Sequence, residues 1–232
     1  RVLTQIVILS LVGGLLCLDR IFLQAMLSRP IIIAPVMGLL LGDAYTGLII
    51  GAIFELFWMD RAPIGIYIPP NDSIASAFAA ALAILAGQSL GAVTKELTAL
   101  SVLLAVPFGI LAKKMDVRMM AANDLLSDRA LEAARSRDLR AIENMTCLAL
   151  GRAFVLYAGL LFILQVIFIP LVINLYPKLP VQAGGALTLT YYFLPVLGTA
   201  VALSTIKLRG AVPVFCAIFL AAVLAMDYFH VF

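Results

Sequence analysis

Residues 54–72, FELFWMDRAPIGIYIPPND, bring polar and aromatic side chains together in an otherwise apolar chain. They include Glu55, Asn71 and Asp72, and Trp58 is the only tryptophan of the chain. Carboxylates and carboxamides accept hydrogen bonds from adjacent hydroxyls such as those of a sugar, and an indole offers a flat apolar face to the C–H side of that sugar. Glu55, Asn71 and Asp72 are therefore candidate hydroxyl ligands, and Trp58 is a candidate stacking residue.

The backbone of this segment cannot remain helical, because three prolines fall within residues 60–70 and Gly65 relaxes the chain between them. Backbone groups freed from a helix at membrane depth are tolerated only against protein or a water-filled cavity. One of residues 71–73 is expected to cap the helix that follows, and the free N–H groups of its first turn should face the broken segment. These features predict one wall of a polar pocket.

Glu55 follows eleven uncharged residues, and a carboxylate near the bilayer centre costs about 2.5–3.5 kcal/mol on insertion scales. It therefore needs a partner, which Arg61 or a hydroxylated ligand could supply. A purely structural alternative stays open: Glu55 pairs with Arg61, and Asp72 only caps its helix.

The elements that must position these side chains are membrane helices, because only 12% of the residues are charged, 64% are hydrophobic and the mean hydropathy is +1.11. Such a composition excludes a soluble domain. Seven stretches carry no charge: 2–18, 30–42, 73–94, 97–112, 153–173, 179–206 and 210–226. Five approach the roughly 20 residues that a spanning helix needs, whereas 30–42 and 97–112 are short. The first stretch continues into Asp19 and Arg20 without a cleavage pattern, so we expect a retained helix.

Charge divides the chain into an N-terminal membrane block (1–112), a polar insert (113–152) and a C-terminal membrane block (153–232), which together form one permease domain. The insert holds half of the sixteen basic residues and six of the thirteen acidic ones. The positive-inside rule places it in the cytoplasm. Apolar residues at three- and four-residue spacing predict one short amphipathic helix in the insert, lying at the membrane surface; they are Ala122, Leu125, Leu126, Ala130, Ala133 and Ala134.

The N-terminal block allows several arrangements of the apolar pieces 30–42 and 44–54, which are broken at Gly42 and Asp43. They could form one long tilted helix, two half-helices or a re-entrant hairpin. Glycine pairs at four-residue spacing predict close helix packing; they are Gly38 and Gly42, Gly47 and Gly51, and Gly87 and Gly91. The predicted fold is thus an all-α, multi-pass membrane protein with broken helices or a re-entrant hairpin and one cytoplasmic amphipathic insert.

Several functional classes are disfavoured. The net charge of +3 with no long basic run gives no reason to expect nucleic acid as a partner. Cys17, Cys147 and Cys216 show no CxxC spacing and are expected to be packing or lipid-facing thiols, and His230 is expected to be a frayed terminal residue. The chain shows no nucleophile–base pair, metal-ligand cluster or phosphate-binding loop, so we expect no catalytic residues, no metal and no cofactor.

The order of several motifs resembles the membrane subunit enzyme IIC of the mannose/fructose/sorbose family of the bacterial phosphoenolpyruvate-dependent sugar phosphotransferase system. The resemblance is densest over residues 18–88. Its motifs are Arg29-Pro30, GLLLGD (38–43), Gly47 and Gly51, FELFWM (54–59), Ile64-Gly65, PPND (69–72) and Ala75-Ser76. It implies a non-catalytic sugar permease subunit in the bacterial cytoplasmic membrane, forming homo- and hetero-oligomers. It also implies a membrane partner, enzyme IID, and soluble IIA and IIB proteins that carry the phosphoryl group to a hexose.

Carried over to this sequence, the resemblance favours Glu55, Asp72 and Asn71 as hydroxyl ligands and Trp58 for stacking. Asp43 is a second choice, because it could only cap the following helix. Gln5 and Gln88 are weaker candidates. The Pro-Pro-Asn-Asp sequence, where many members of the family have Pro-Asp, prevents a transfer of sugar preference.

Two other functions stay open. In an ion-coupled secondary transporter, Glu55 and Asp72 would titrate as a proton relay and no IIB or IID partner would be needed. In an orphan regulatory protein, the polar insert would be a signalling surface without vectorial transport.

Overall fold

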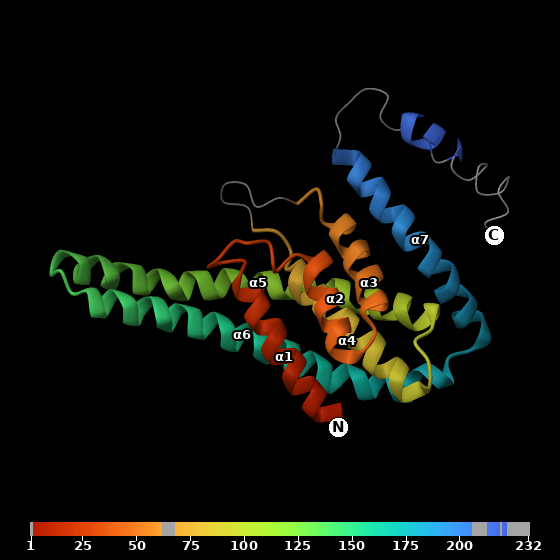
Figure 1. The fold of residues 1–232 in the computed structure, drawn as a ribbon, viewed down its shortest axis with the longest axis horizontal. Helices are drawn as coiled ribbons and strands as arrows, with labels where there is room; N and C mark the ends of the chain where they lie inside the picture. The colour runs from red at the N-terminus through yellow and green to blue at the C-terminus, as the bar shows by residue number, and fades with distance from the viewer. Residues whose placement is uncertain (1, 62–67, 206–212, 219, 222–232) are drawn as a thin grey trace.

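The computed structural model describes residues 2–61, 68–205, 213–218 and 220–221, and the elements in these ranges are helical (Figure 1). They are α1 (Val2–Leu18), α2 (Pro30–Leu41), α3 (Ala44–Phe57), α4 (Asp72–Leu90), α5 (Lys95–Arg135), α6 (Leu139–Leu175), the 3-10 turn η1 (Tyr176–Lys178) and α7 (Val181–Thr205). Helices α4, α5, α6 and α7 are long and apolar enough to cross a membrane. The all-helical prediction is confirmed. Residues 62–67, most of 210–226 and His230 lie outside the described ranges.

Helix α4 is the centre of the fold, and every residue from Ser73 to Gly87 is buried. It packs against α1, α2, α3, α5 and α6. The helix begins at the Asn71 cap and ends at Gly91, whose φ of 101° is a left-handed conformation that suits glycine. Its side chains are mostly small, which allows neighbours to approach from every side, and the buried serines Ser73 and Ser76 bond to backbone carbonyls.

Helices α2 and α3 form an antiparallel hairpin, which excludes the single long tilted helix. Gly42 ends α2 in the left-handed region (φ 81°), and the Asp43 side chain caps α3 by accepting from the Thr46 N–H at 3.0 Å. At 12 and 14 residues, the helices extend only about 18–21 Å, less than the hydrocarbon core of a bilayer. These lengths fit a hairpin that enters the membrane and returns.

The three glycine pairs act in two ways. A Cβ atom on Gly47 would lie 2.5 Å from the Ala34 carbonyl oxygen, and one on Gly51 would lie 2.5 Å from that of Pro30, so this pair packs α3 directly on the α2 backbone. The other two pairs serve turns instead of helix–helix contacts. A Cβ atom on Gly38 would meet the backbone just after Gly42, and one on Gly87 would meet the backbone just after Gly91.

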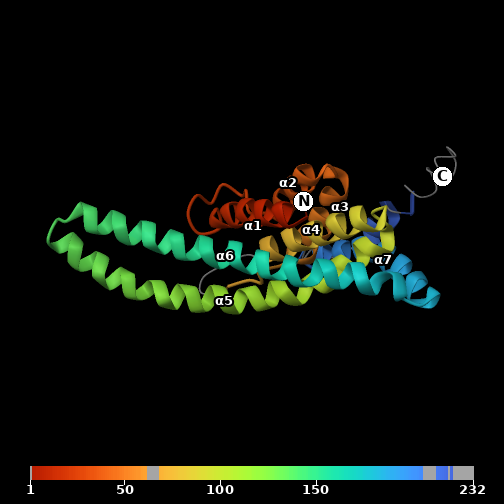
Figure 2. The same ribbon diagram turned by 90° about the horizontal axis from the view of Figure 1, so that it is seen from below.

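The polar segment 113–152 is not one short helix but the distal part of two long antiparallel helices, α5 and α6, which project from the core as an arm (Figures 1 and 2). Arg137, with φ of 57°, lies in the turn between them, and Asp138 caps α6. The run 97–112 is not a short helix either, since α5 continues through it. The helix persists because its buried stripe continues at heptad spacing through Ala105, Gly109, Ala112, Asp116 and Met119.

Helix α7 packs on α5 and α3, with only Leu194 and Gly198 of this helix buried. Polar contacts hold its first half to the start of α5: Lys95 donates to the Tyr192 hydroxyl at 2.6 Å, and Thr188 donates to Glu96 at 2.6 Å. Leu187 and Tyr191 are partly buried against the core, and much of the remaining apolar surface of α7 is exposed, as expected for a helix at the edge of a membrane-embedded core.

Candidate functional site

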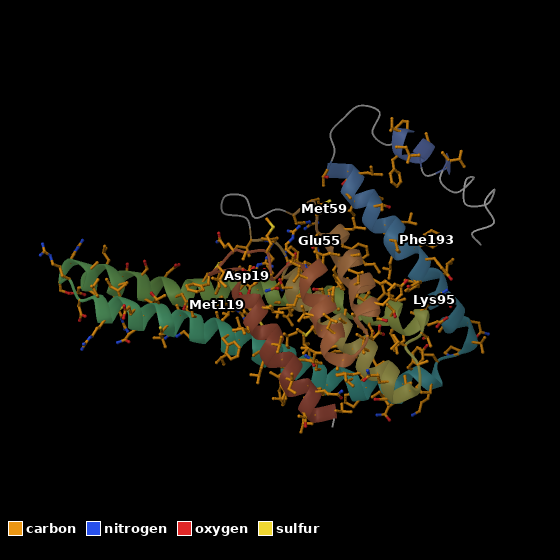
Figure 3. The ribbon with its side chains drawn as sticks, in the orientation of Figure 1. Asp19, Glu55, Met59, Lys95, Met119 and Phe193 are labelled. Carbon is orange, nitrogen blue, oxygen red and sulfur yellow. The ribbon has the colours of Figure 1, made fainter. Side chains whose placement is uncertain are left out.

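A cavity of about 870 Å³ opens where the core meets the arm. Its size falls within the range of about 300–1,000 Å³ that is typical of small-molecule sites. It is lined by the loop between α1 and α2, the end of α3, residues 68–72, α5 and α6. The polar and aromatic side chains in its lining are Asp19, Arg20, Gln24, Ser28, Arg29, Trp58, Arg61, Asp72, Asp116 and Tyr157. In Figure 3, Asp19, Glu55 and Met59 lie at this end of the core, and Lys95 lies at the other end beside α7.

Asp72 is paired with Arg20 in the wall of the cavity. Arg20 Nη1 donates to Asp72 Oδ1 at 2.7 Å, and Arg20 Nη2 donates to the Pro70 carbonyl at 3.3 Å. The two side chains are 21% and 19% exposed, so solvent or a ligand can reach the pair. The fold brings together residues that lie 52 positions apart in the sequence.

Asn71 lies behind this wall and is fully buried. Its Oδ1 accepts from the Ile74 N–H at 3.0 Å, and its Nδ2 donates to Asp116 Oδ2 at 2.9 Å. Asp72 Oδ1 accepts from the Ser73 N–H at 2.9 Å. The N–H groups of Ser73 and Ile74, which the sequence predicted to be free, are therefore occupied by the side chains of Asp72 and Asn71.

Trp58 lines the cavity at the end of α3. One face of its indole stacks on Phe54, with ring centroids 5.3 Å apart and ring planes at 25°. Gly109 of α5 makes room for the ring, because a Cβ atom there would lie 3.0 Å from it. Only the part of the indole that Phe54 does not cover is available to a ligand.

Glu55 does not line the cavity. It links the end of α3 to the start of α2, at the open end of the hairpin. Its carboxylate accepts from the Arg29 guanidinium and, at 3.4 Å, from the Ile31 N–H. The sequence suggested Arg61 as its partner, but the structure shows Arg29, because the hairpin returns α3 to the start of α2. Arg61 instead lies 3.6 Å from Asp60.

Asp43, Gln88 and Gln5 are not brought to the cavity. Asp43 caps α3 at the tip of the hairpin, and Gln88 donates to the Leu41 carbonyl beside that tip at 2.7 Å. Gln5 is half-buried near the start of α1, fourteen residues or about 21 Å along the helix direction from Asp19. Asp43, Gln88 and Gln5 therefore lie at the end of the core that is far from the cavity, where Asp43 and Gln88 stabilise the tip of the hairpin.

Asp19 holds the loop between α1 and α2 in place. In the sequence, this residue marked only the end of a predicted membrane helix. Its carboxylate accepts from the Ala25 N–H at 2.8 Å and from the Ser28 N–H at 3.2 Å. Burial acts to raise the pKa of Asp19, but these hydrogen bonds outweigh it and lower the pKa below its ordinary value. Gln24 and Met26 adopt positive φ angles of 53° and 65°, an uncommon conformation for side-chain-bearing residues.

Asp116 is another cavity residue that the sequence did not mark as a site candidate, because it falls within the predicted polar insert 113–152. A signal was present: it is the acidic member of the buried heptad stripe of α5. A carboxylate on an otherwise apolar helix face inside a membrane protein indicates a functional position. Together with Arg20 and Asp72, Asp116 gives the cavity charged groups suited to hydrogen bonding with hydroxyls.

Comparisons with known proteins agree on one family. A family model described as the sorbose-specific IIC component of the PTS system matches residues 3–231. Among curated relatives, the putative N-acetylgalactosamine permease IIC component 2 of Escherichia coli (strain K12) is 35% identical over 85 residues, covering 37% of this chain and 64% of that protein. The fructose permease IIC component of Bacillus subtilis (strain 168) is 24% identical, covering 61% and 49%. The sorbose-specific EIIC component of Klebsiella pneumoniae is 25% identical, covering 83% and 70%.

The chain therefore spans about half to two thirds of the length of several curated relatives. Two solved structures share its fold. One, described as a membrane protein, has a TM-score of 0.73 at 21% identity, covering 99% of this chain and 92% of the other. The second, the mannose transporter ManYZ in complex with microcin E492, has a TM-score of 0.60 at 21% identity, covering 96% and 86%.

Proposed function

This chain belongs to the family of sorbose-specific IIC components of the phosphotransferase system, and we propose that it is a sugar-binding permease subunit whose substrate occupies the cavity at the start of α4. The observation that carries the proposal is the joint presence of the Asp72–Arg20 pair and Trp58 in one cavity of suitable size. The relatives named for fructose, sorbose and N-acetylgalactosamine support a monosaccharide as the substrate class.

Asp72 is the principal hydroxyl ligand in this proposal. Its hydrogen bonds to described residues use Oδ1, so Oδ2 can accept from a hydroxyl of the sugar. Arg20 holds the carboxylate in place, because its guanidinium donates to Oδ1 at 2.7 Å and leaves Oδ2 toward the ligand. The exposed part of Trp58 packs against the C–H face of the ring. Asn71 is buried and does not contact the sugar; it fixes the start of α4, which carries Asp72.

The cavity opens toward the cytoplasm in this proposal. Lys113, Lys114 and Arg118 flank Asp116 on α5, and basic residues near the ends of membrane helices favour the cytoplasmic side. Arg20 and Arg29 lie at the same end of the core, because both line the cavity with Asp116. A sugar there would be accessible to a soluble phosphoryl donor.

The chain would work with partner subunits in the bacterial cytoplasmic membrane. A IID-like membrane protein would complete the permease, and soluble IIA and IIB proteins would deliver the phosphoryl group to the sugar. The ManYZ likeness and the family membership support such partners. The exposed apolar surface of α7 and the arm of α5 and α6 are among the surfaces available to them.

Equilibrium binding of radiolabelled mannose, fructose, sorbose and N-acetylgalactosamine to the purified full chain tests the proposal. We expect saturable binding of at least one sugar and a loss of about ten-fold or more in affinity for Asp72→Asn, since a hydrogen bond to a charged group is worth about 1.5–3 kcal/mol. Asp124→Asn, an exposed change of the same chemistry on the arm, serves as control. Unchanged affinity of Asp72→Asn would remove the cavity from the binding site.

Copurification from native membranes after gentle solubilisation tests the partners. A IID-like membrane protein in the eluate, with a more loosely bound IIB protein, supports group translocation. A folded chain that purifies alone in good yield would favour the orphan or ion-coupled alternatives.

A further inference from the structure

Three buried side-chain oxygens have no hydrogen-bond partner among the described residues: Asp116 Oδ1, Asn123 Oδ1 and Gln165 Oε1. Buried polar atoms are normally hydrogen-bonded, so each of these requires an explanation. Asn123 and Gln165 do not line the cavity, whereas Asp116 does. Asp116 is therefore the one of these three residues that borders a space for a ligand.

The surroundings of Asp116 fix its other oxygen. The residue is 3% exposed, and Oδ2 accepts from Asn71 Nδ2 at 2.9 Å. This bond holds the carboxylate beside the start of α4, where Arg20 and Asp72 are its charged neighbours. Tyr157 of α6 lines the same part of the cavity, and its hydroxyl lies near the Asp116 carboxylate. Asn71 thus positions Oδ2, and Oδ1 has no hydrogen-bond partner of normal geometry among the described residues.

We propose that Asp116 is a further substrate-binding residue, whose Oδ1 accepts a hydrogen bond from one hydroxyl of the bound sugar. This inference rests on the proposed function and assigns a residue of the polar arm helix to the same site. Asp116 and Asp72 then contact the substrate from different helices, α5 and α4. Two acceptors on two helices select for the spacing of two hydroxyls, which makes Asp116 a determinant of specificity.

A set of sugar analogues that each lack one hydroxyl tests the contact. The sugar that binds best among mannose, fructose, sorbose and N-acetylgalactosamine is compared with its monodeoxy analogues, for the wild-type chain and for Asp116→Asn. An asparagine can still accept from Asn71 but can present an N–H group, which is not an acceptor, where Oδ1 lies. We expect two analogues to lose about ten-fold or more in affinity for the wild-type chain, and one of these two deletions to have little effect in Asp116→Asn.

A purely structural role of Asp116 predicts another pattern. Asp116→Asn would then weaken the parent sugar and every analogue by the same factor, and this result would overturn the inference. The wild-type measurements alone also decide the question if the variant does not fold. If two hydroxyls each lose about ten-fold when deleted, the two-acceptor site is supported; if none loses more than about three-fold, it is refuted.

The outcomes separate this inference from the proposed function. If the wild-type chain binds none of the four sugars, the proposed function fails and the inference fails with it. If the wild-type chain binds a sugar and Asp72→Asn does not, while Asp116→Asn keeps the wild-type pattern across all analogues, only the role of Asp116 is refuted. Asp124→Asn controls for loss of a carboxylate elsewhere on α5 and should match the wild-type chain throughout.

Discussion

Replacing Gly47 with alanine should separate the two helices of the hairpin. The added Cβ atom would lie 2.5 Å from the Ala34 carbonyl oxygen and 2.9 Å from Pro35 Cα. Ordinary contacts between carbon atoms are about 3.5–4.0 Å, so α2 would have to withdraw by roughly 1 Å. Both obstructing atoms belong to the backbone, and no side-chain rotation can relieve them.

The expected loss follows from this geometry. Overpacking of a tight contact costs about 1–3 kcal/mol, whereas alanine gains up to about 1 kcal/mol over glycine in helix propensity. Gly159 of α6 isolates the second effect, because a Cβ atom there meets nothing within 4 Å. The free energies of unfolding of Gly47→Ala and Gly159→Ala should therefore differ by about 1–3 kcal/mol, with Gly47→Ala the less stable.

Thermal unfolding of the purified variants, followed by the fluorescence of Trp58, measures the difference. For a chain of this size each kcal/mol corresponds to about 2–4 °C in Tm. Gly47, Gly51 and Glu55 lie one turn apart on the same side of α3, so the change should also disturb the contact of Glu55 with Arg29. Equal Tm values for the two variants would refute the close backbone contact between α2 and α3.

Three further variants probe the site and the arm. Glu55→Gln keeps an acceptor but removes the charge that pairs with Arg29, so we expect a lower Tm and a smaller loss of sugar affinity than for Asp72→Asn; a larger loss in a binding titration would place Glu55 in the cavity. Asp19→Ala should speed hydrogen exchange of the Ala25 and Ser28 amides by about ten-fold or more at neutral pH. Because the pKa of Asp19 is lowered by folding, this protection in the wild-type chain is present above about pH 4 and is lost as the pH falls through the lowered value; exchange equal to that of the wild-type chain at neutral pH would contradict it. Replacing residues 123–140 of the arm with a short turn should spare sugar binding but impair phosphorylation by the soluble donor, and unchanged phosphorylation rates would show that the arm has no such role.

Local chemistry made part of the site predictable from the sequence. Proline and asparagine act on their own backbone, so a break in the helix within residues 60–70 and a helix cap within residues 71–73 followed from residue type. The structure ends α3 at Phe57 and caps α4 with Asn71. The hairpin was one of three arrangements that the break at Gly42 and Asp43 allowed. The chain forms the hairpin because Gly42 allows a left-handed turn and because Gly47 and Gly51 let α3 pack closely on the backbone of α2.

The pairs across the site depend on the fold and could not be predicted in the same way. Arg61 is nearer to Glu55 in sequence, but the hairpin places Arg29 beside it. Arg20 reaches Asp72 only because the end of α1 and the start of α4 lie at the same side of the core. Asp116 was not predicted to lie in the site, because the high density of charges after residue 112 indicated the end of the membrane block. The buried stripe of α5 continues past that position at heptad spacing and includes Asp116.

The most direct test of the sugar site uses the reporter that the cavity already contains. Trp58 is the only tryptophan and lines the cavity, so its fluorescence reports events there. On titration with mannose, fructose, sorbose and N-acetylgalactosamine, we predict a saturable change for at least one sugar in the wild-type chain. In Asp72→Asn, the midpoint of this titration should lie at a concentration about ten-fold or more higher. Saturable binding measured by radiolabelled sugar with no change in Trp58 fluorescence, or the same fluorescence titration in Asp72→Asn, would contradict the assignment of the sugar to this cavity.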